Sequence, residues 1–119
     1  MTNQQIADHL QAFIEQGNYD GAYDTLFHPD AVAIEPQLAE MGLGEVKGLQ
    51  AIKNKVQALS AGIENLVSRE MSSAIVTDKH IAFTNIVQAK LKDGNDFNLS
   101  EICLYQVEDG KIISEEFIY

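Results

Sequence analysis

The fold is decided by residues 101–113, EICLYQVEDGKII, because this segment holds two extended apolar runs around a tight turn. The runs are rich in Val, Ile, Leu and Tyr, and the acidic residues and glycine at 108–110 separate them, which is the pattern of a β-hairpin. Similar turn signals recur at 78–79 and at 92–94. We therefore expect four strands in meander order from about Ile63 onward, and such a sheet is antiparallel.

Helical periodicity precedes these strands. Residues 2–17 carry apolar residues at helical spacing, and Thr2 followed by Gln5 is the pattern of a capping box at the start of the helix. A second, short amphipathic helix starts at Tyr19 and continues until Pro29 breaks it. These two segments predict a helical hairpin at the start of the chain.

A third helix is expected over residues 49–62, where apolar residues again recur at helical spacing. Before it, small and large apolar side chains alternate over residues 31–35, and Pro36 follows directly. This pattern favours a short strand at the edge of the sheet. Glycines at 42, 44 and 48 indicate a loop. The whole pattern predicts an α+β fold, with three helices packed on the concave face of a curved antiparallel sheet.

Length and charge limit the possible functions. The chain has 119 residues, which predicts a single domain over residues 1–119. Its net charge of −10 repels nucleic acid and anionic lipid, so we expect neither as a partner. One cysteine excludes an internal disulfide framework, and no long apolar run or basic leader is visible, so we expect a cytoplasmic protein.

The turns also predict which side chains share a face, because residues directly opposite in an antiparallel pair point to the same side. We expect three-residue loops at 108–110 and at 92–94, each with its glycine in the left-handed position. The expected pairs are Val107 with Lys111, Tyr105 with Ile113, Cys103 with Glu115, Glu101 with Phe117, Leu99 with Tyr119, Asn85 with Glu101 and Phe83 with Cys103. A two-residue loop at 109–110 is the alternative, and it would move Glu115 and Tyr119 to the other face.

The face predicted in this way is apolar except for Asn85, Glu101 and Glu115. Its apolar members are Ile81, Phe83, Val87, Ala89, Phe97, Leu99, Tyr105, Val107, Ile113 and Phe117. A carboxylate buried without a partner costs several kcal/mol or shifts its pKa upward. The three polar groups therefore indicate either a cluster for proton transfer or ligand binding, or a polar network in which they satisfy one another.

The order of elements and three sequence segments resemble the SnoaL-like branch of the nuclear transport factor 2-like superfamily. The segments are residues 26–32, LFHPDAV, residues 48–52, GLQAI, and residues 101–113. The resemblance implies a cone in which a curved sheet wraps around helices, with a pocket at one end and frequent homodimers through the outer sheet face. It leaves the function open, because this superfamily contains isomerases, cyclases, hydrolases, dehydratases and binding modules.

The resemblance can be followed residue by residue. Glu35 stands at the position of the general base of ketosteroid isomerase, whereas the two hydrogen-bond donors to the substrate oxygen would fall at Leu10 and Cys103. Because neither residue can act as such a donor, the resemblance does not imply a steroid isomerase. It does not imply a polyketide cyclase either, because Cys103 also stands where those cyclases have an acidic residue. An epoxide hydrolase of the limonene type needs an arginine, and Arg69 is the only one in the chain. The side of the sheet on which Arg69 lies stays undecided, because the turn at 77–80 fits either a two-residue or a three-residue loop.

These features predict a pocket for a small, largely apolar hydroxy or keto compound. The expected catalytic residues are Glu35, Glu101 and Glu115, and the expected ligand-binding residues are Asn85, Cys103, Tyr105, Phe117, Tyr119 and Phe13. Tyr19 and Tyr23 are expected to belong to the apolar stripe of their helix. No metal or cofactor is expected, since the three histidines lack ligand spacing. The alternative is a non-catalytic module for ligand binding or homodimerisation.

Overall fold

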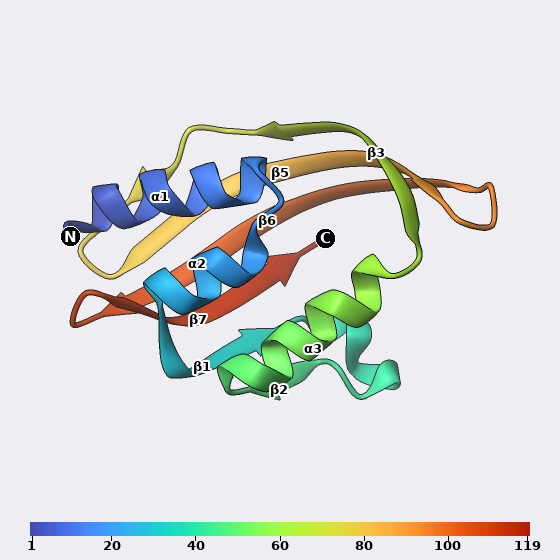
Figure 1. The fold of residues 1–119 in the computed structure, drawn as a ribbon. Helices are drawn as coiled ribbons and strands as arrows, with labels where there is room; N and C mark the ends of the chain where they lie inside the picture. Colours follow the sequence, from blue (N-terminus) through green and yellow to red (C-terminus); the bar gives the residue numbers. More distant parts are fainter.

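A computed structural model describes all 119 residues of the chain (Figure 1). The elements in chain order are α1 (Asn3–Glu15), α2 (Tyr19–Leu26), β1 (Phe27–Ile34), the 3-10 helix η1 (Pro36–Met41), β2 (Glu45–Lys47), α3 (Leu49–Ser60), β3 (Ile63–Met71), β4 (Ile75–Val76), β5 (His80–Leu91), β6 (Asp96–Glu108) and β7 (Lys111–Ile118). The three predicted α-helices and the predicted α+β class are confirmed. None of the helices is long and apolar enough to cross a membrane.

The helices begin where the sequence places caps. The Thr2 hydroxyl accepts the backbone N–H of Gln5 at 3.1 Å, and the Gln5 side chain accepts the backbone N–H of Thr2 at 2.8 Å, so the predicted capping box forms. Asn18 caps α2 in a similar way by accepting the N–H of Gly21. Each bond satisfies a backbone donor that the first turn of a helix leaves free, and such a cap contributes about 1 kcal/mol.

The sheet has the order β2-β1-β7-β6-β5-β3, with β4 paired to β5. Strands β3, β5, β6 and β7 form the predicted antiparallel meander. Two expectations are wrong: β1 is parallel to β7, and it lies inside the sheet because the short strand β2 covers its outer edge. Pro29 is tolerated within β1 because the pairing with β7 is irregular between Phe27 and Val32. The loop expected at 42–48 contains β2, and η1 precedes it.

The β6–β7 turn differs from the predicted one. Glu108 pairs with Lys111, so the loop has two residues, Asp109 and Gly110, both with positive φ (50° and 77°), as a tight hairpin turn requires. The register then shifts, because Ile113 on β7 has no opposite residue. Beyond this bulge the observed pairs are Tyr105 with Glu115 and Cys103 with Phe117, which corrects the predicted pairs.

The bulge decides which residues of β7 are buried. One extra residue in β7 compensates the shorter loop, so Glu115 still shares the inner face with Tyr105 and Cys103. Between the turn and the bulge, the inward and outward positions of β7 are exchanged, so Ile112 is fully buried in place of the predicted Ile113. The register of β5 with β6 is the predicted one, with Asn85 opposite Glu101.

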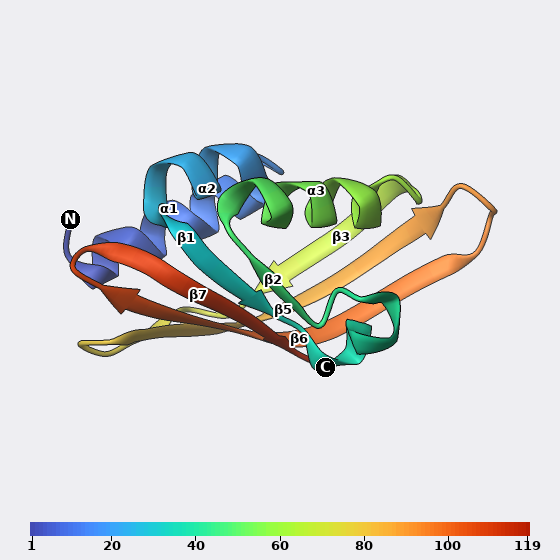
Figure 2. The same cartoon turned by 90° about the horizontal axis from the view of Figure 1, so that it is seen from below.

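The core lies between the helices and the concave face of the sheet. Figure 2 shows α1, α2 and α3 on the same side of the curved sheet. The completely buried side chains of the core include Ile6, Leu26, Ile52, Ile81 and Ile112. Burying one such side chain contributes about 1.5–3 kcal/mol, so this layer holds the helices against the strands.

Candidate functional site

A cavity of about 190 Å³ lies between the helices and the concave face of the sheet, and we call it the central cavity. Its lining residues come from α1 and α2 (Leu10, Ile14, Tyr19, Tyr23), β1 and the residue after it (Phe27, Glu35), α3 (Lys55, Val56, Leu59, Ser60), β5 and β6 (Asn85, Leu99, Glu101, Cys103, Tyr105) and β7 (Glu115, Phe117). Leu59 and Ser60, at the end of α3, are exposed, so the cavity meets solvent there. Most of the lining is apolar, and the polar groups are few and specifically placed, as in small-molecule sites.

Glu35 is held by a cation and a hydroxyl. It follows β1 directly and is 7% exposed. Lys55 Nζ lies 2.8 Å from Glu35 Oε1, and the Tyr119 hydroxyl donates to Glu35 Oε2 at 2.6 Å. Lys55 is itself 5% exposed, and its ammonium makes no contact of hydrogen-bond geometry, so it meets Glu35 as an ion pair only. The Lys55–Glu35 pair is thus a buried ion pair, in which each charge compensates the other.

Glu115 is the most deeply buried acid of the cavity. It is 3% exposed, and the Tyr23 hydroxyl on α2 donates to its Oε1 at 2.9 Å. Burial raises the pKa of Glu115 to about 7, against the Tyr23 hydrogen bond and the Lys55 charge, which lower it, while Glu35 and Glu101 raise it further. Glu115 can therefore release or accept a proton near neutral pH.

Glu101 and Asn85 face each other across β5 and β6, as the register predicts. Asn85 Nδ2 donates to Glu101 Oε1 at 3.0 Å, and Cys103 Sγ lies 3.5 Å from the same oxygen. Burial raises the pKa of Glu101, although these two hydrogen bonds oppose the effect. Asn85 Oδ1 is buried and has no hydrogen-bond partner. One acceptor of this pair is therefore left free, which is unusual for a buried polar atom.

Cys103 is buried and free. Burial and the neighbouring Glu101 carboxylate raise the pKa of its thiol, so the thiol stays protonated. A reactive thiolate needs a positive environment, and Cys103 has an acidic one. Its place in the site is that of a small apolar lining residue.

Aromatic side chains form the floor of the cavity. The ring centroid of Tyr105 lies 6.3 Å from that of Phe27, 5.7 Å from that of Phe83 and 6.5 Å from that of Phe117. Lys55 Nζ lies 6.0 Å from the Phe117 ring centroid, within the range of a cation–π contact. Phe27, Tyr105 and Phe117 line the cavity together with the acidic groups, whereas Phe83 does not, so the expected aromatic lining is present.

The structure brings most of the predicted site residues together, and places two elsewhere. Glu35, Asn85, Glu101, Cys103, Tyr105, Glu115 and Phe117 line the same cavity. Tyr119 lies outside the lining but bonds to Glu35, and the pKa of its hydroxyl is raised by burial and by that carboxylate. Phe13 packs against the core from α1 and does not line the cavity.

Sequence reasoning missed two polar groups of the cavity, Lys55 and Tyr23. Tyr23 was expected to be only an apolar stripe residue, yet its hydroxyl bonds to Glu115. Lys55 lies three residues after Ile52 and four before Leu59, so helical spacing places it on the apolar face of α3. A lysine at such a position is a detectable signal, since lysine is rarely buried without a partner.

The face of Arg69 is decided by the pairing of β3 with β5. Arg69 lies opposite Val87, which is buried, so its side chain is on the inner face. Arg69 Nη1 donates to the Ile14 carbonyl at 2.6 Å, and Nη2 donates to the Tyr19 hydroxyl at 2.7 Å. Arg69 thus fixes the end of α1 and one tyrosine of the cavity wall.

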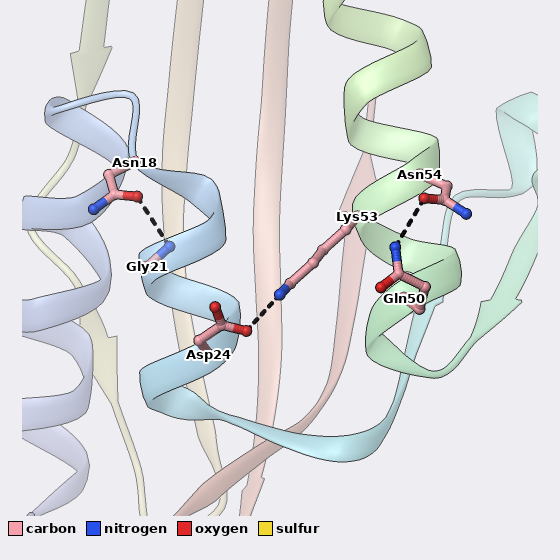
Figure 3. Close-up of polar contacts among 6 residues, drawn as sticks. All are labelled: Asn18, Gly21, Asp24, Gln50, Lys53 and Asn54. Atoms are coloured by element: carbon pink, nitrogen blue, oxygen red, sulfur yellow. Dashed lines mark hydrogen bonds and ion pairs between the residues drawn. The ribbon is translucent and has the colours of Figure 1, made fainter.

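A second, polar groove of about 480 Å³ runs between α2 and α3, next to the central cavity. Figure 3 shows polar contacts of these two helices: Asp24 on α2 pairs with Lys53 on α3, and Gln50 donates to Asn54 within α3. Tyr19 and Val56 line both the groove and the cavity. Because Asp24 is largely exposed, its ion pair contributes little stability, about 1 kcal/mol or less.

The fold and the lined cavity define a nuclear transport factor 2-like cone. A family model described as a SnoaL-like domain matches residues 1–119. The chain therefore belongs to the SnoaL-like domain family, which confirms the resemblance seen in the sequence. No curated protein sequence matches the chain.

Solved structures of similar fold agree with this assignment. A Mesorhizobium loti protein whose name calls it a SnoaL-like polyketide cyclase has 24% identity and a TM-score of 0.85, and each chain is covered to 100%. TerC, crystallised with polyporic acid, has 18% identity and a TM-score of 0.79, covering 98% of this chain and 90% of its own. A Catenulispora acidiphila protein of ketosteroid isomerase-like fold, in complex with trimethylamine, has 18% identity and a TM-score of 0.72, covering 95% and 84%. At these identities the likeness shows the fold alone.

Proposed function

We propose that the central cavity binds a small, largely apolar hydroxy or keto compound and catalyses a proton transfer on it. The observation that carries this proposal is the convergence of Glu35, Glu101 and Glu115 on one cavity, where Asn85 Oδ1 has no partner. In a polar network with only a structural role, buried groups satisfy one another. A polar network that is left incomplete next to a cavity supports the binding of a ligand instead.

Glu115 is the group best suited to move a proton. Its pKa of about 7 keeps both the acid and the carboxylate populated near neutral pH. As a carboxylate it takes a proton from the carbon beside a keto group, and as the resulting acid it returns that proton to the same compound at another atom. Negative charge then develops on the keto oxygen, and Lys55 is the one basic side chain of the lining that can stabilise it.

The remaining acids would orient the ligand. Glu35 is occupied by Lys55 and Tyr119, so its role is to hold that ammonium in the cavity wall. Glu101 and Asn85 offer acceptors to a hydroxyl group. Two proteins of similar fold were crystallised with small organic compounds, polyporic acid and trimethylamine, which supports a small-molecule ligand here as well.

Hydrogen exchange beside a carbonyl tests the catalytic proposal with simple ketones as probes. A panel of single-ring ketones is incubated with the protein in heavy water, and deuterium uptake beside the carbonyl is followed by mass spectrometry. Wild-type protein should accelerate exchange for at least one ketone, and Glu115→Gln should remove the acceleration. If the wild type accelerates exchange for none of them, the catalytic proposal fails.

A second candidate function is homodimerisation through the convex face of the sheet. Ile86, Ile102 and Ile118 are 43%, 47% and 41% exposed there, and Ile102 pairs directly with Ile118 across β6 and β7. Adjacent exposed isoleucines on an uncovered sheet face are typical of an interface between proteins. This role is compatible with the cavity, because the helices cover the opposite face.

The single buried cysteine fits a reducing compartment such as the cytoplasm.

A further inference from the structure

We infer that the ligand carries a protonated amino group, which the Glu101 carboxylate binds at the wall of the central cavity. The inference rests on the proposed function in one respect, since it uses the same cavity. It adds a chemical class: a small amine whose apolar body occupies the aromatic part of the cavity.

The charges around the cavity are unbalanced. Three acidic side chains line it, whereas Lys55 is the only basic one, and its ammonium is already paired with Glu35. Neither Glu101 nor Glu115 has a cation within 4.0 Å. Arg69 attracts Glu101 only from a distance, because its two terminal nitrogens donate to Ile14 and Tyr19. The site therefore lacks positive charge that a ligand can supply.

The Glu101–Asn85 pair leaves one carboxylate oxygen free. Asn85 Nδ2 donates to Glu101 Oε1, and Asn85 Oδ1, which accepts nothing, is itself covered by protein atoms. Glu101 Oε2 accepts no hydrogen bond from the protein, and Glu101 lines the cavity. This carboxylate oxygen matches the donors of an ammonium group, which has several N–H bonds and no acceptor. A carboxylate or keto group cannot satisfy it.

The aromatic part of the cavity suits the rest of such a ligand. Phe27, Tyr105 and Phe117 present apolar rings to the same volume, and aromatic rings attract cations. About 190 Å³ is below the 300–1,000 Å³ usual for drug-sized ligands, which favours a compound with a single ring. The net charge of −10 also steers cations toward the protein.

Three probes with the same ring and different charge test this inference: benzylamine, benzyl alcohol and benzoate. Their dissociation constants are measured by NMR titration at about pH 8, where the amine is protonated. Benzylamine should bind about tenfold or more tightly than benzyl alcohol, which corresponds to one hydrogen bond between charged groups. Benzoate should bind most weakly.

Variants assign the preference to the named residue. Glu101→Gln should reduce benzylamine binding to the level of benzyl alcohol, and an amide NMR spectrum like that of the wild type away from the cavity shows that the variant is folded. Glu70→Gln, the same change at an exposed position of β3, is the control for net charge and should keep the preference.

The outcomes separate the inference from the proposed function. Equal binding of amine and alcohol, tighter binding of benzoate, or a preference that survives Glu101→Gln would overturn the inference and leave a ligand-binding cavity. If the wild type binds none of the three probes, both the inference and the proposed small-molecule site fail.

Discussion

The Tyr23 hydroxyl on α2 donates to Glu115 Oε1 on β7 at 2.9 Å, and the two residues are 92 positions apart in the chain. This bond joins the helical layer to the sheet at the base of the central cavity. It is also one of the two interactions that lower the pKa of Glu115 against the effect of burial. The same contact therefore affects both the packing and the chemistry of the site.

Tyr23→Phe should destabilise the protein more at pH 8 than at pH 5. At the higher pH Glu115 is a carboxylate, and a hydrogen bond to a charged group contributes about 1.5–3 kcal/mol, against about 1 kcal/mol for a neutral pair. The free energy of unfolding is measured by urea denaturation at both pH values. Equal losses at the two pH values would show that Glu115 does not ionise in the folded protein over this range.

Glu115 should also make the protein more stable in mild acid. Its folded pKa of about 7 lies above the ordinary value of 4.5, so the folded state binds the proton more tightly than the unfolded state. The resulting stabilisation is complete below pH 4.5 and is lost as the pH rises through about 7. It amounts to roughly 3 kcal/mol, at 1.36 kcal/mol for each pKa unit.

Glu115→Gln removes this titration, so the unfolding free energy of the variant should change less between pH 4.5 and pH 7.5 than that of the wild type. Glu116→Gln, on the neighbouring residue, is the matched control and should behave as the wild type does. The same pH dependence in wild type and Glu115→Gln would assign the effect to other groups.

Removing one member of the buried ion pair between Lys55 and Glu35 should strongly lower the free energy of unfolding. Lys55→Met leaves Glu35 buried without a counter-charge, which costs about 3–5 kcal/mol. Glu35→Gln in the same chain should recover much of this loss, because no buried charge then remains. A double-mutant cycle by urea denaturation measures the coupling, and additive effects of the two changes would contradict a buried pair.

The convex face should hold two copies of the chain together. Light scattering after gel filtration should give the mass of a dimer for the wild type and of a monomer for Ile102→Glu, because a charge cannot be buried against the isoleucines of a second copy. Leu66→Glu, at a residue of comparable exposure on β3, is the control. A monomeric wild type would remove dimerisation as a function of this face.

The sequence predicts most of the sheet because turn chemistry is local. The glycine at 94, with φ 89°, ends a three-residue loop, and the β5–β6 register follows from it. At 108–110 the same turn chemistry favours the wrong loop length, and the bulge at Ile113 restores the face of Glu115. Neither the bulge nor the parallel pairing of β1 with β7 has a local signal, since both depend on how distant segments meet.

The polar partners of the acids show the same limit. Glu101 and Glu115 could be selected from strand positions, and Glu35 from the resemblance, whereas Lys55 and Tyr23 approach these acids from helices. Sequence spacing shows that both side chains lie on apolar helix faces, but it does not show which strand residue each one meets. Only the packing of α2 and α3 on the sheet brings Tyr23 to Glu115 and Lys55 to Glu35.

The most direct test of the site is a carbon-13 NMR titration of the glutamate carboxyls in the wild-type protein, with Glu115→Gln and Glu101→Gln used to assign the two signals. We predict a pKa of about 7 for Glu115 and a pKa above the ordinary value for Glu101. If Glu115 and Glu101 titrate together with the exposed glutamates, both carboxyls are in contact with water, and the proposal of a buried proton-transfer site is contradicted.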